Sequence, residues 1–249
     1  MADLSQRNFS YAPLMQLTAL QLPARFNAAP EQLAFAEALL ESGPRTDLIL
    51  LPEAALTGYV SPEGDFDLTA FAEPLQGPTH SALAHLARRF DALVVGPLIE
   101  RTPDGRFNAL IAVTPDGTTA LHYRKRHPWF PEKWATPGPA PSNVFTWRGK
   151  KITAAICFDV HFLAEDTAPE LTAADLLLFP SAWVDDEGDA RPGLFQPLAQ
   201  QFELAVLNAN WGPGSPLIHG QGGSLFIDPR GQLQARLTAD TGRLDVTLP

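Results

Sequence analysis

Apolar residues in the first half of the chain follow two patterns, which are continuous runs and a helical repeat. The segments Leu14 to Leu22 and Leu48 to Leu51 are nearly continuous apolar runs, which is typical of buried strands. Between them, Pro30 begins a segment whose apolar residues fall on one face of a helix, namely Leu33, Phe35, Ala36, Leu39 and Leu40. Strand, helix and strand in this order predict a β-α-β unit.

The same kind of pattern continues toward the middle of the chain. It predicts a helix over 79–90 and strands over 92–99, 107–114 and 118–123. Pro115-Asp116-Gly117 joins the last two strands and is a strong hairpin signal, so these strands should run antiparallel. We therefore expect a mixed sheet.

In the second half, a short apolar run over 152–156 predicts a buried strand that ends by presenting Cys157. After it the pattern predicts helices over 164–174 and 192–203, and strands over 176–179, 204–208, 223–227, 232–237 and 243–248. No repeat, low-complexity segment or linker divides the chain. We expect one α/β domain over residues 1–249, which is long enough to bury a large core.

Composition and charge narrow the possible partners. The chain has 45% hydrophobic and 18% charged residues, as ordinary globular proteins do, and a formal net charge of -10. That charge repels phosphate backbones and anionic lipids, so nucleic acid and membrane partners are not expected. The N-terminus lacks the apolar core of a signal peptide, and a single cysteine cannot form an internal disulfide. We expect a cytoplasmic protein.

Cys157 is the first candidate for chemistry. A lone cysteine at the end of a buried strand is more often inert core than a nucleophile, and that alternative stays open for this stretch alone. Two residues at the ends of other predicted strands favour a catalytic role. Glu53 follows the strand 48–51, and Lys125 follows the strand 118–123. Open α/β sheets place their sites at such strand ends.

Strand alternation suggests where these two side chains point. Ile49, Leu51 and Glu53 would share one face of their strand, which directs the carboxylate toward the interior. Leu121, Tyr123 and Lys125 would likewise share an apolar face. The alternative for Glu53 is a solvated loop glutamate after Pro52, and the alternative for Lys125 is a solvated lysine at the tip of a basic loop. Together a carboxylate base, a thiol and an ammonium suit acyl transfer, with the Phe158 backbone N–H as a second oxyanion donor.

Six ordered motifs carry a resemblance to a known family: Leu-Pro-Glu-Ala-Ala-Leu-Thr-Gly-Tyr at 51–59, Tyr-Arg-Lys-Arg-His at 123–127, Ile-Cys-Phe-Asp at 156–159, Phe-Pro-Ser-Ala-Trp at 179–183, Asn-Ala-Asn-Trp-Gly at 208–212 and Gly-Gly-Ser-Leu-Phe-Ile-Asp-Pro-Arg-Gly at 222–231. The chain resembles the nitrilase or carbon-nitrogen hydrolase superfamily. The resemblance implies a four-layer αββα sandwich of two mixed sheets flanked by helices. It also implies a homodimer formed through the helices that flank the cysteine.

The resemblance further implies roles for particular residues. Glu53 would be the base, Lys125 the oxyanion stabiliser and Cys157 the nucleophile. Glu132 would be a second glutamate that positions substrate and lysine, although a surface glutamate is an equal alternative. Tyr59 and Trp183, which lie in matching motifs, would help to position substrate together with Phe158. The alternative for Trp183 and Trp211 is plain core packing.

Within this superfamily, Cys-Phe-Asp is similar to the amidase pattern, whereas nitrilases typically have Trp-Glu after the cysteine. The favoured function is therefore hydrolysis of a small linear amide through a Cys157 thioester. N-carbamoyl or nitrile hydrolysis and a non-catalytic binding or regulatory role are the alternatives. His161 stands where many members have an arginine, which puts the identity of the substrate in doubt.

No cofactor and no metal are expected, because the sequence has no pair of cysteines and neither His-Glu-x-x-His nor His-x-His. The glycines at 220, 222 and 223 match no phosphate-binding motif and predict a tight turn into a strand. His161 and His219 are more often structural than catalytic in such positions. The acidic loop Asp185, Asp186, Glu187 and Asp189 favours a cationic or neutral substrate, unless it is simply solvated.

Overall fold

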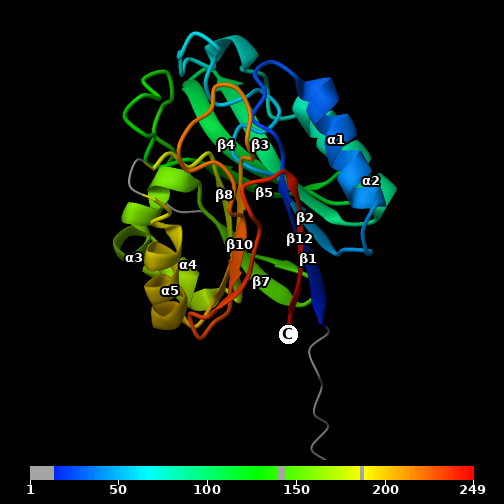
Figure 1. Ribbon diagram of the computed structural model, residues 1–249, viewed down its shortest axis with the longest axis vertical. Helices are drawn as coiled ribbons and strands as arrows, with labels where there is room; N and C mark the ends of the chain where they lie inside the picture. Colours follow the sequence, from blue (N-terminus) through cyan, green and yellow to red (C-terminus); the bar gives the residue numbers. More distant parts are fainter. Residues whose placement is uncertain (1–13, 140–143, 186–187) are drawn as a thin grey trace, which may run out of the picture.

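The computed structural model describes residues 14–139, 144–185 and 188–249. In these segments two six-stranded sheets pack face to face, and helices cover the outer face of each sheet (Figure 1). The predicted four-layer αββα sandwich is therefore confirmed. No helix in the described part of the chain is both long enough and apolar enough to cross a membrane.

The first sheet contains, in spatial order, β12 (Gly242–Leu248), β1 (Met15–Gln21), β2 (Leu48–Leu50), β3 (Leu93–Thr102), β4 (Gly105–Val113) and β5 (Thr119–Arg124). The second contains β11 (Leu233–Arg236), β10 (Leu225–Ile227), β9 (Ala205–Asn210), β8 (Leu176–Ser181), β7 (Lys150–Ala154) and β6 (Phe145–Trp147). The centre of each sheet is parallel, with β1, β2 and β3 in one and β7, β8 and β9 in the other. The remaining pairs are antiparallel, so both sheets are mixed, as predicted.

Helices lie on the two outer faces of the sandwich. α1 (Ala29–Glu41) and α2 (Pro78–Phe90) cover the first sheet, whereas α3 (Leu163–Asp166), α4 (Ala168–Ala173) and α5 (Arg191–Phe202) cover the second (Figure 1). Two 3₁₀ turns, η1 (Thr69–Phe71) and η2 (Cys157–His161), complete the elements of the described segments.

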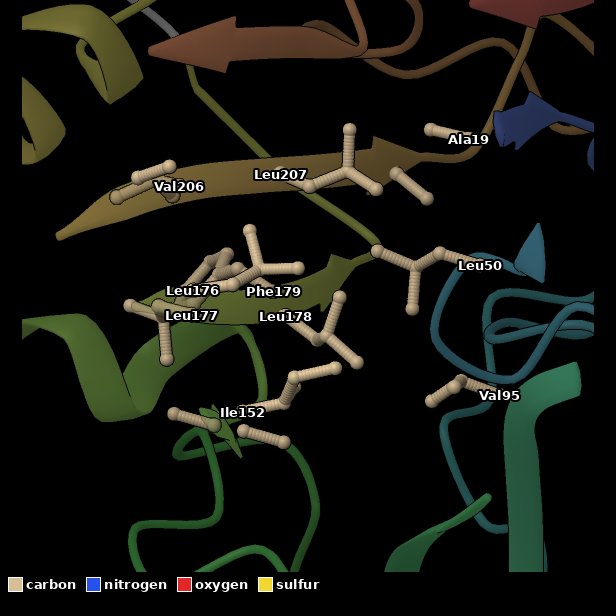
Figure 2. Packing of buried hydrophobic residues seen from close by; sticks show 14 of the residues in the cluster. Ala19, Leu50, Val95, Ile152, Leu176, Leu177, Leu178, Phe179, Val206 and Leu207 are labelled. Carbon is tan, nitrogen blue, oxygen red and sulfur yellow. The ribbon is translucent and has the colours of Figure 1, made fainter. Parts of the chain in front are cut away.

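The strand β2, at the centre of the first sheet, is apolar on both faces because each face is covered. Leu48 and Leu50 pack in the core between the two sheets, while Ile49 and Leu51 pack with residues of α1 and α2. Figure 2 shows Leu50, with Ala19 and Val95, facing the side chains of β8 and β9. Continuous apolar runs such as this one are expected for buried parallel strands.

Two local differences from the sequence prediction have physical causes. The helix expected over 164–174 is divided into α3 and α4, with Thr167 between them in a non-helical conformation. Pro169 in the first turn of α4 has no N–H to donate to the preceding turn, so one continuous helix is disfavoured. The strand β6 was not predicted, because its three residues follow a proline-rich segment and show no clear period.

Candidate active site

Cys157 lies in a sharp turn rather than at the end of a strand. β7 ends at Ala154, and Cys157 is the first residue of η2 with a backbone φ of 45°. A non-glycine residue in this left-handed region is strained, and such strain is often found at functional sites. The turn points the thiol into the interior of the molecule, where Cys157 is buried. The strand predicted over 152–156 thus ends two residues earlier, at Ala154, and Cys157 follows it in the turn.

Glu53 is buried, but strand alternation does not explain its direction. Ile49 and Leu51 face the helices, so alternation would send Glu53 to the same side. Instead β2 ends at Leu50, and the chain turns through Ala54, whose φ is 50°. The carboxylate thereby reaches the other side of the sheet, where its Oε2 accepts the backbone N–H of Ala182 at 2.9 Å.

Lys125 has the direction that alternation predicts, because it follows Leu121 and Tyr123 on the face that packs against the second sheet. Its side chain is fully buried. The ammonium donates to Glu53 Oε1 at 2.7 Å and to Glu132 Oε2 at 2.6 Å. These charge-assisted bonds account for the stability of a buried ammonium, which needs paired partners.

Glu132 is part of this cluster and is not a surface residue. It is 2% exposed, and its Oε2 also accepts the backbone N–H of Trp129 at 2.6 Å. Burial raises the pKa of the Glu132 carboxyl, and the charge of Glu53 adds to the rise, while Lys125 lowers it. The cluster thus holds two carboxyl groups and one ammonium, and no net positive charge.

Asn108 is a member of the cluster that sequence reasoning missed. Its Nδ2 donates to Glu53 Oε1 at 2.8 Å and to Glu132 Oε1 at 2.6 Å, so one amide group fixes the orientation of both carboxylates. The available signal was weak. A single polar residue stands in the otherwise apolar run Phe107 to Val113 at a position that is 1% exposed.

Asp159 was also missed, although it lies two residues after the cysteine. Its carboxylate accepts hydrogen bonds from the backbone N–H of Ile156 at 3.0 Å, the backbone N–H of His127 at 2.9 Å and the Tyr123 hydroxyl at 2.7 Å. Asp159 therefore binds the turn that carries Cys157 to the segment on either side of Lys125. The available signal was its place in the motif Ile-Cys-Phe-Asp at 156–159, in which sequence reasoning gave the aspartate no role.

The surroundings of Cys157 favour the protonated form of its thiol. Burial raises the pKa of the thiol well above the ordinary value of 9.0, and the charge of Glu53 raises it further, while Lys125 and the backbone N–H of Ala182 lower it. Because the thiolate is the nucleophile, a thiol in this environment needs a base when it attacks.

A cavity of about 100 Å³ opens in front of the thiol. The described residues that line it are Tyr59, Trp129, Cys157, Phe158, His161, Ala182, Trp183 and Val184. The structure thus brings the predicted Tyr59, Phe158 and Trp183 to the same cavity as Cys157, and it adds Trp129 and Val184, which were not predicted. Trp211 lies behind this wall, where its indole N–H donates to the Trp183 carbonyl at 2.9 Å.

The other residues singled out from the sequence lie outside this cavity. Asp185, Asp189 and His219 line a separate cavity of about 400 Å³, while Asp186 and Glu187 lie outside the described residues. The glycines at 220, 222 and 223 all have positive φ and form the predicted turn before β10. Within the described segments, no group of three or more His, Cys, Asp or Glu side chains is arranged to hold a metal ion.

Comparison with known proteins identifies the family. The model of the carbon-nitrogen hydrolase family matches residues 16–248. The chain belongs to this family. It is 33% identical over 204 residues to an (R)-stereoselective amidase from Pseudomonas sp., which covers 81% of this chain and 71% of that protein. It is 30% identical over 225 residues to the omega-amidase YafV of Yersinia enterocolitica, which covers 89% of this chain and 84% of that protein.

A solved structure supports the same family. A mutant of the amidase from Nesterenkonia sp. AN1, with the acetamide moiety of fluoroacetamide added covalently at its active-site cysteine, superposes with a TM-score of 0.81 at 28% identity. The match covers 94% of this chain and 90% of that one. The resemblance stated from the six motifs, including its amidase-like branch, is therefore confirmed.

Proposed function

We propose that this carbon-nitrogen hydrolase is an amidase that cleaves a small linear amide through a thioester on Cys157. The observation that carries the proposal is the buried ammonium of Lys125, held between Glu53 and Glu132 beside the cavity of Cys157. Such a costly buried cluster, placed next to a lone thiol, is expected where charge develops in a reaction. The amidase relatives and the adduct on the cysteine of the Nesterenkonia amidase support it.

In the first half-reaction, Glu53 accepts the thiol proton while the Cys157 sulfur attacks the amide carbon. The carbonyl oxygen becomes an oxyanion, and Lys125 with the Phe158 backbone N–H stabilises it. Phe158 lies in the first turn of η2, where backbone N–H groups have no partner within the helix. The C–N bond then breaks, the nitrogen takes the proton from Glu53, and ammonia or an amine leaves.

In the second half-reaction, water attacks the thioester carbon. Glu53 accepts a proton from the water, the C–S bond breaks, and the proton returns to the Cys157 sulfur, so the free enzyme is regenerated with a carboxylic acid as product. Glu132 and Asn108 act by holding Lys125 and Glu53 in place. Tyr59 and Trp183 form the walls against which the acyl group rests. No cofactor takes part in this scheme.

The test compares the wild type with Cys157→Ala and Glu53→Gln on a panel of short amides, N-carbamoyl compounds and nitriles. We expect ammonia release from amides and an acyl adduct on Cys157 by intact-mass spectrometry, with both lost in Cys157→Ala. Full amide cleavage by Cys157→Ala would contradict the proposal. Cleavage of only the N-carbamoyl compounds or only the nitriles would show that the substrate belongs to that class and is not an amide. If no compound of the panel reacts, a non-catalytic binding role would be favoured.

We also infer a homodimer, on the basis of the family resemblance, with contacts through the helices that follow the cysteine, α3 and α4. Sedimentation at micromolar concentration measures this directly. A strictly monomeric mass would contradict the inference. The cytoplasmic location expected from the sequence stays a prediction.

A further inference from the structure

The described walls of the cavity of Cys157 contain no permanently charged side chain. They are mainly aromatic and aliphatic, and they include no carboxylate and no lysine or arginine. His161 is the only basic side chain among them. It lies at the rim, with its ring 5.0 Å from that of Phe158 and 6.4 Å from that of Trp183.

The groups behind the thiol do not supply positive charge either. Lys125 is the one ammonium in the buried cluster, and two carboxyl groups bind it. If both carboxyl groups are ionised, the cluster has a charge of minus one; if one of them keeps a proton, the cluster is neutral. A negatively charged acyl group would therefore meet at best a neutral surface in a buried site, where an unpaired charge is expensive.

The nearby arginines are already paired. Arg191, which interacts electrostatically with Cys157, binds Asp189 through Nε at 2.7 Å and Nη2 at 3.0 Å, and Arg236 binds the same carboxylate. Both arginines line the separate cavity of about 400 Å³ and not that of Cys157. The Trp183 indole N–H donates to Asp185 at 3.3 Å, so the group bound to this wall is a carboxylate and not a cation.

We propose that the cavity of Cys157 selects short uncharged acyl groups and excludes those with a carboxylate, and that His161 at its rim determines this selectivity. The proposal specifies the substrate class and rests on the proposed function. His161 is exposed at the edge of the cavity, and its partial burial lowers the pKa of the ring, which favours the neutral form that offers a hydrogen bond but no charge. An uncharged acyl group packs against the aromatic walls without losing the solvation of a charge.

Alkylation tests the proposal independently of turnover, because Cys157 is the only cysteine of the chain. Iodoacetamide and iodoacetate differ mainly in the charge of the group that must enter the cavity. The rate ratio of the two reagents on Cys157, measured by intact mass, is divided by the ratio for free N-acetylcysteine. We expect the normalised ratio to favour iodoacetamide by about tenfold or more, since an unpaired buried charge costs at least one factor of ten. A normalised ratio near one, or no alkylation by either reagent, would overturn the proposal.

Two variants of His161 test its role. His161→Arg introduces a permanent cation at the rim and should shift the normalised ratio toward iodoacetate, whereas His161→Gln keeps a neutral polar group and should leave the ratio near that of the wild type. Thermal unfolding controls for folding. A ratio that is unchanged in a folded His161→Arg protein would overturn the role of His161.

Matched substrates extend the test to catalysis. Succinamide and succinamate have nearly the same shape, but only succinamate has a carboxylate. We expect kcat/KM to be at least about tenfold higher for succinamide in the wild type, and the difference to shrink in His161→Arg. Cleavage of amides without charge selection would overturn this inference and leave the proposed function intact. Charge-selective alkylation without cleavage of any amide would support the selectivity of the cavity and contradict the proposed amidase function.

Discussion

The Tyr123 hydroxyl donates to Asp159 Oδ2 at 2.7 Å and so connects β5, which leads to Lys125, with the turn that holds Cys157. Tyr123 belongs to the first sheet, whereas Asp159 lies in the turn that follows β7 of the second sheet. This bond is therefore one of the contacts that set the position of the thiol relative to the ammonium.

Replacing Tyr123 by Phe removes this bond and leaves the ring in place. Because small displacements of reacting groups are costly, we expect kcat to fall by about 10-fold to 100-fold with little change in KM. Steady-state kinetics measures this split. Unchanged kcat in a folded variant would show that the other two donors to Asp159 are sufficient.

Replacing Lys125 by Met leaves two buried carboxyl groups without the cation that binds both of them, while Asn108 still donates to each. We expect a loss of about 3–5 kcal/mol in the free energy of unfolding at neutral pH, as for other broken buried ion pairs. Burial already raises the pKa of the Glu132 carboxyl and Lys125 lowers it, so without the ammonium this pKa rises further above its value in the unfolded chain. Stability should therefore be highest at low pH and fall as the pH rises and the folded protein has to ionise Glu132.

Urea unfolding of Lys125→Met at about pH 5 and pH 8 measures this dependence. Lys151→Met is the matched control, because Lys151 is an exposed lysine on strand β7 of the other sheet. Equal losses at both pH values would indicate that the penalty comes from packing and not from charge.

Replacing Glu53 by Gln should change alkylation and turnover in opposite directions. The Glu53 carboxylate raises the pKa of the Cys157 thiol, so its neutral replacement should lower that pKa and raise the thiolate fraction at a given pH. Alkylation by iodoacetamide should accelerate, while amide turnover should fall by about 100-fold or more if the base is lost. A pH profile of alkylation from about pH 6 to pH 10 measures the shift. Parallel loss of both activities would instead make Glu53 the base for alkylation too.

Glu100, which lies outside the candidate active site, should make the stability of the fold depend on pH. The His122 ring lies 2.9 Å from Glu100 Oε2, Arg124 donates to both oxygens of the carboxylate at 2.6 and 2.8 Å, and the pKa of Glu100 is lowered from 4.5 to about 2. A lowered carboxyl pKa contributes stability above the unfolded value, and this contribution disappears as the pH falls from 4.5 to about 2.

Replacing Glu100 by Gln should cost about 1–3 kcal/mol at pH 7, the usual value of hydrogen bonds to charged groups, and less at acid pH. Thermal unfolding of wild type and variant between about pH 3 and pH 7 tests this. A difference that does not shrink toward acid pH would exclude the ion pair as its cause.

The pattern of apolar and polar residues predicted the direction of a side chain correctly where that direction depends on a single strand. Alternation along β5 gave the correct direction of Lys125, because the strand continues regularly to Arg124. The same rule failed for the direction of Glu53, because β2 ends at Leu50, three residues before it, and the alternation does not continue. The position after a predicted strand and the family motif, and not the direction from alternation, correctly marked Glu53 as a site candidate.

Contacts between distant segments were beyond such rules. Asn108 binds Glu53 and Glu132, which are 55 and 24 residues away in the sequence, and Asp159 binds Tyr123 and His127, which are 36 and 32 residues away. A polar residue in an apolar run shows that a partner is needed but not which residue supplies it. The walls of the cavity combine Trp129, from a proline-rich loop without a period, with residues that follow β8, so only the assembled sandwich defines its charge and shape.

The cluster also draws its members from both halves of the sandwich. Glu53, Asn108 and Lys125 come from the first sheet or the loops after its strands, while Cys157 and the Ala182 N–H come from the second. The apolar layer between the sheets, with Leu50 against β8 and β9, therefore acts as a spacer for the chemistry (Figure 2). Small volume changes in that layer should shift Glu53 and Lys125 relative to Cys157. The enzymatic rate should therefore respond to a change in sheet spacing that is too small to alter thermal stability.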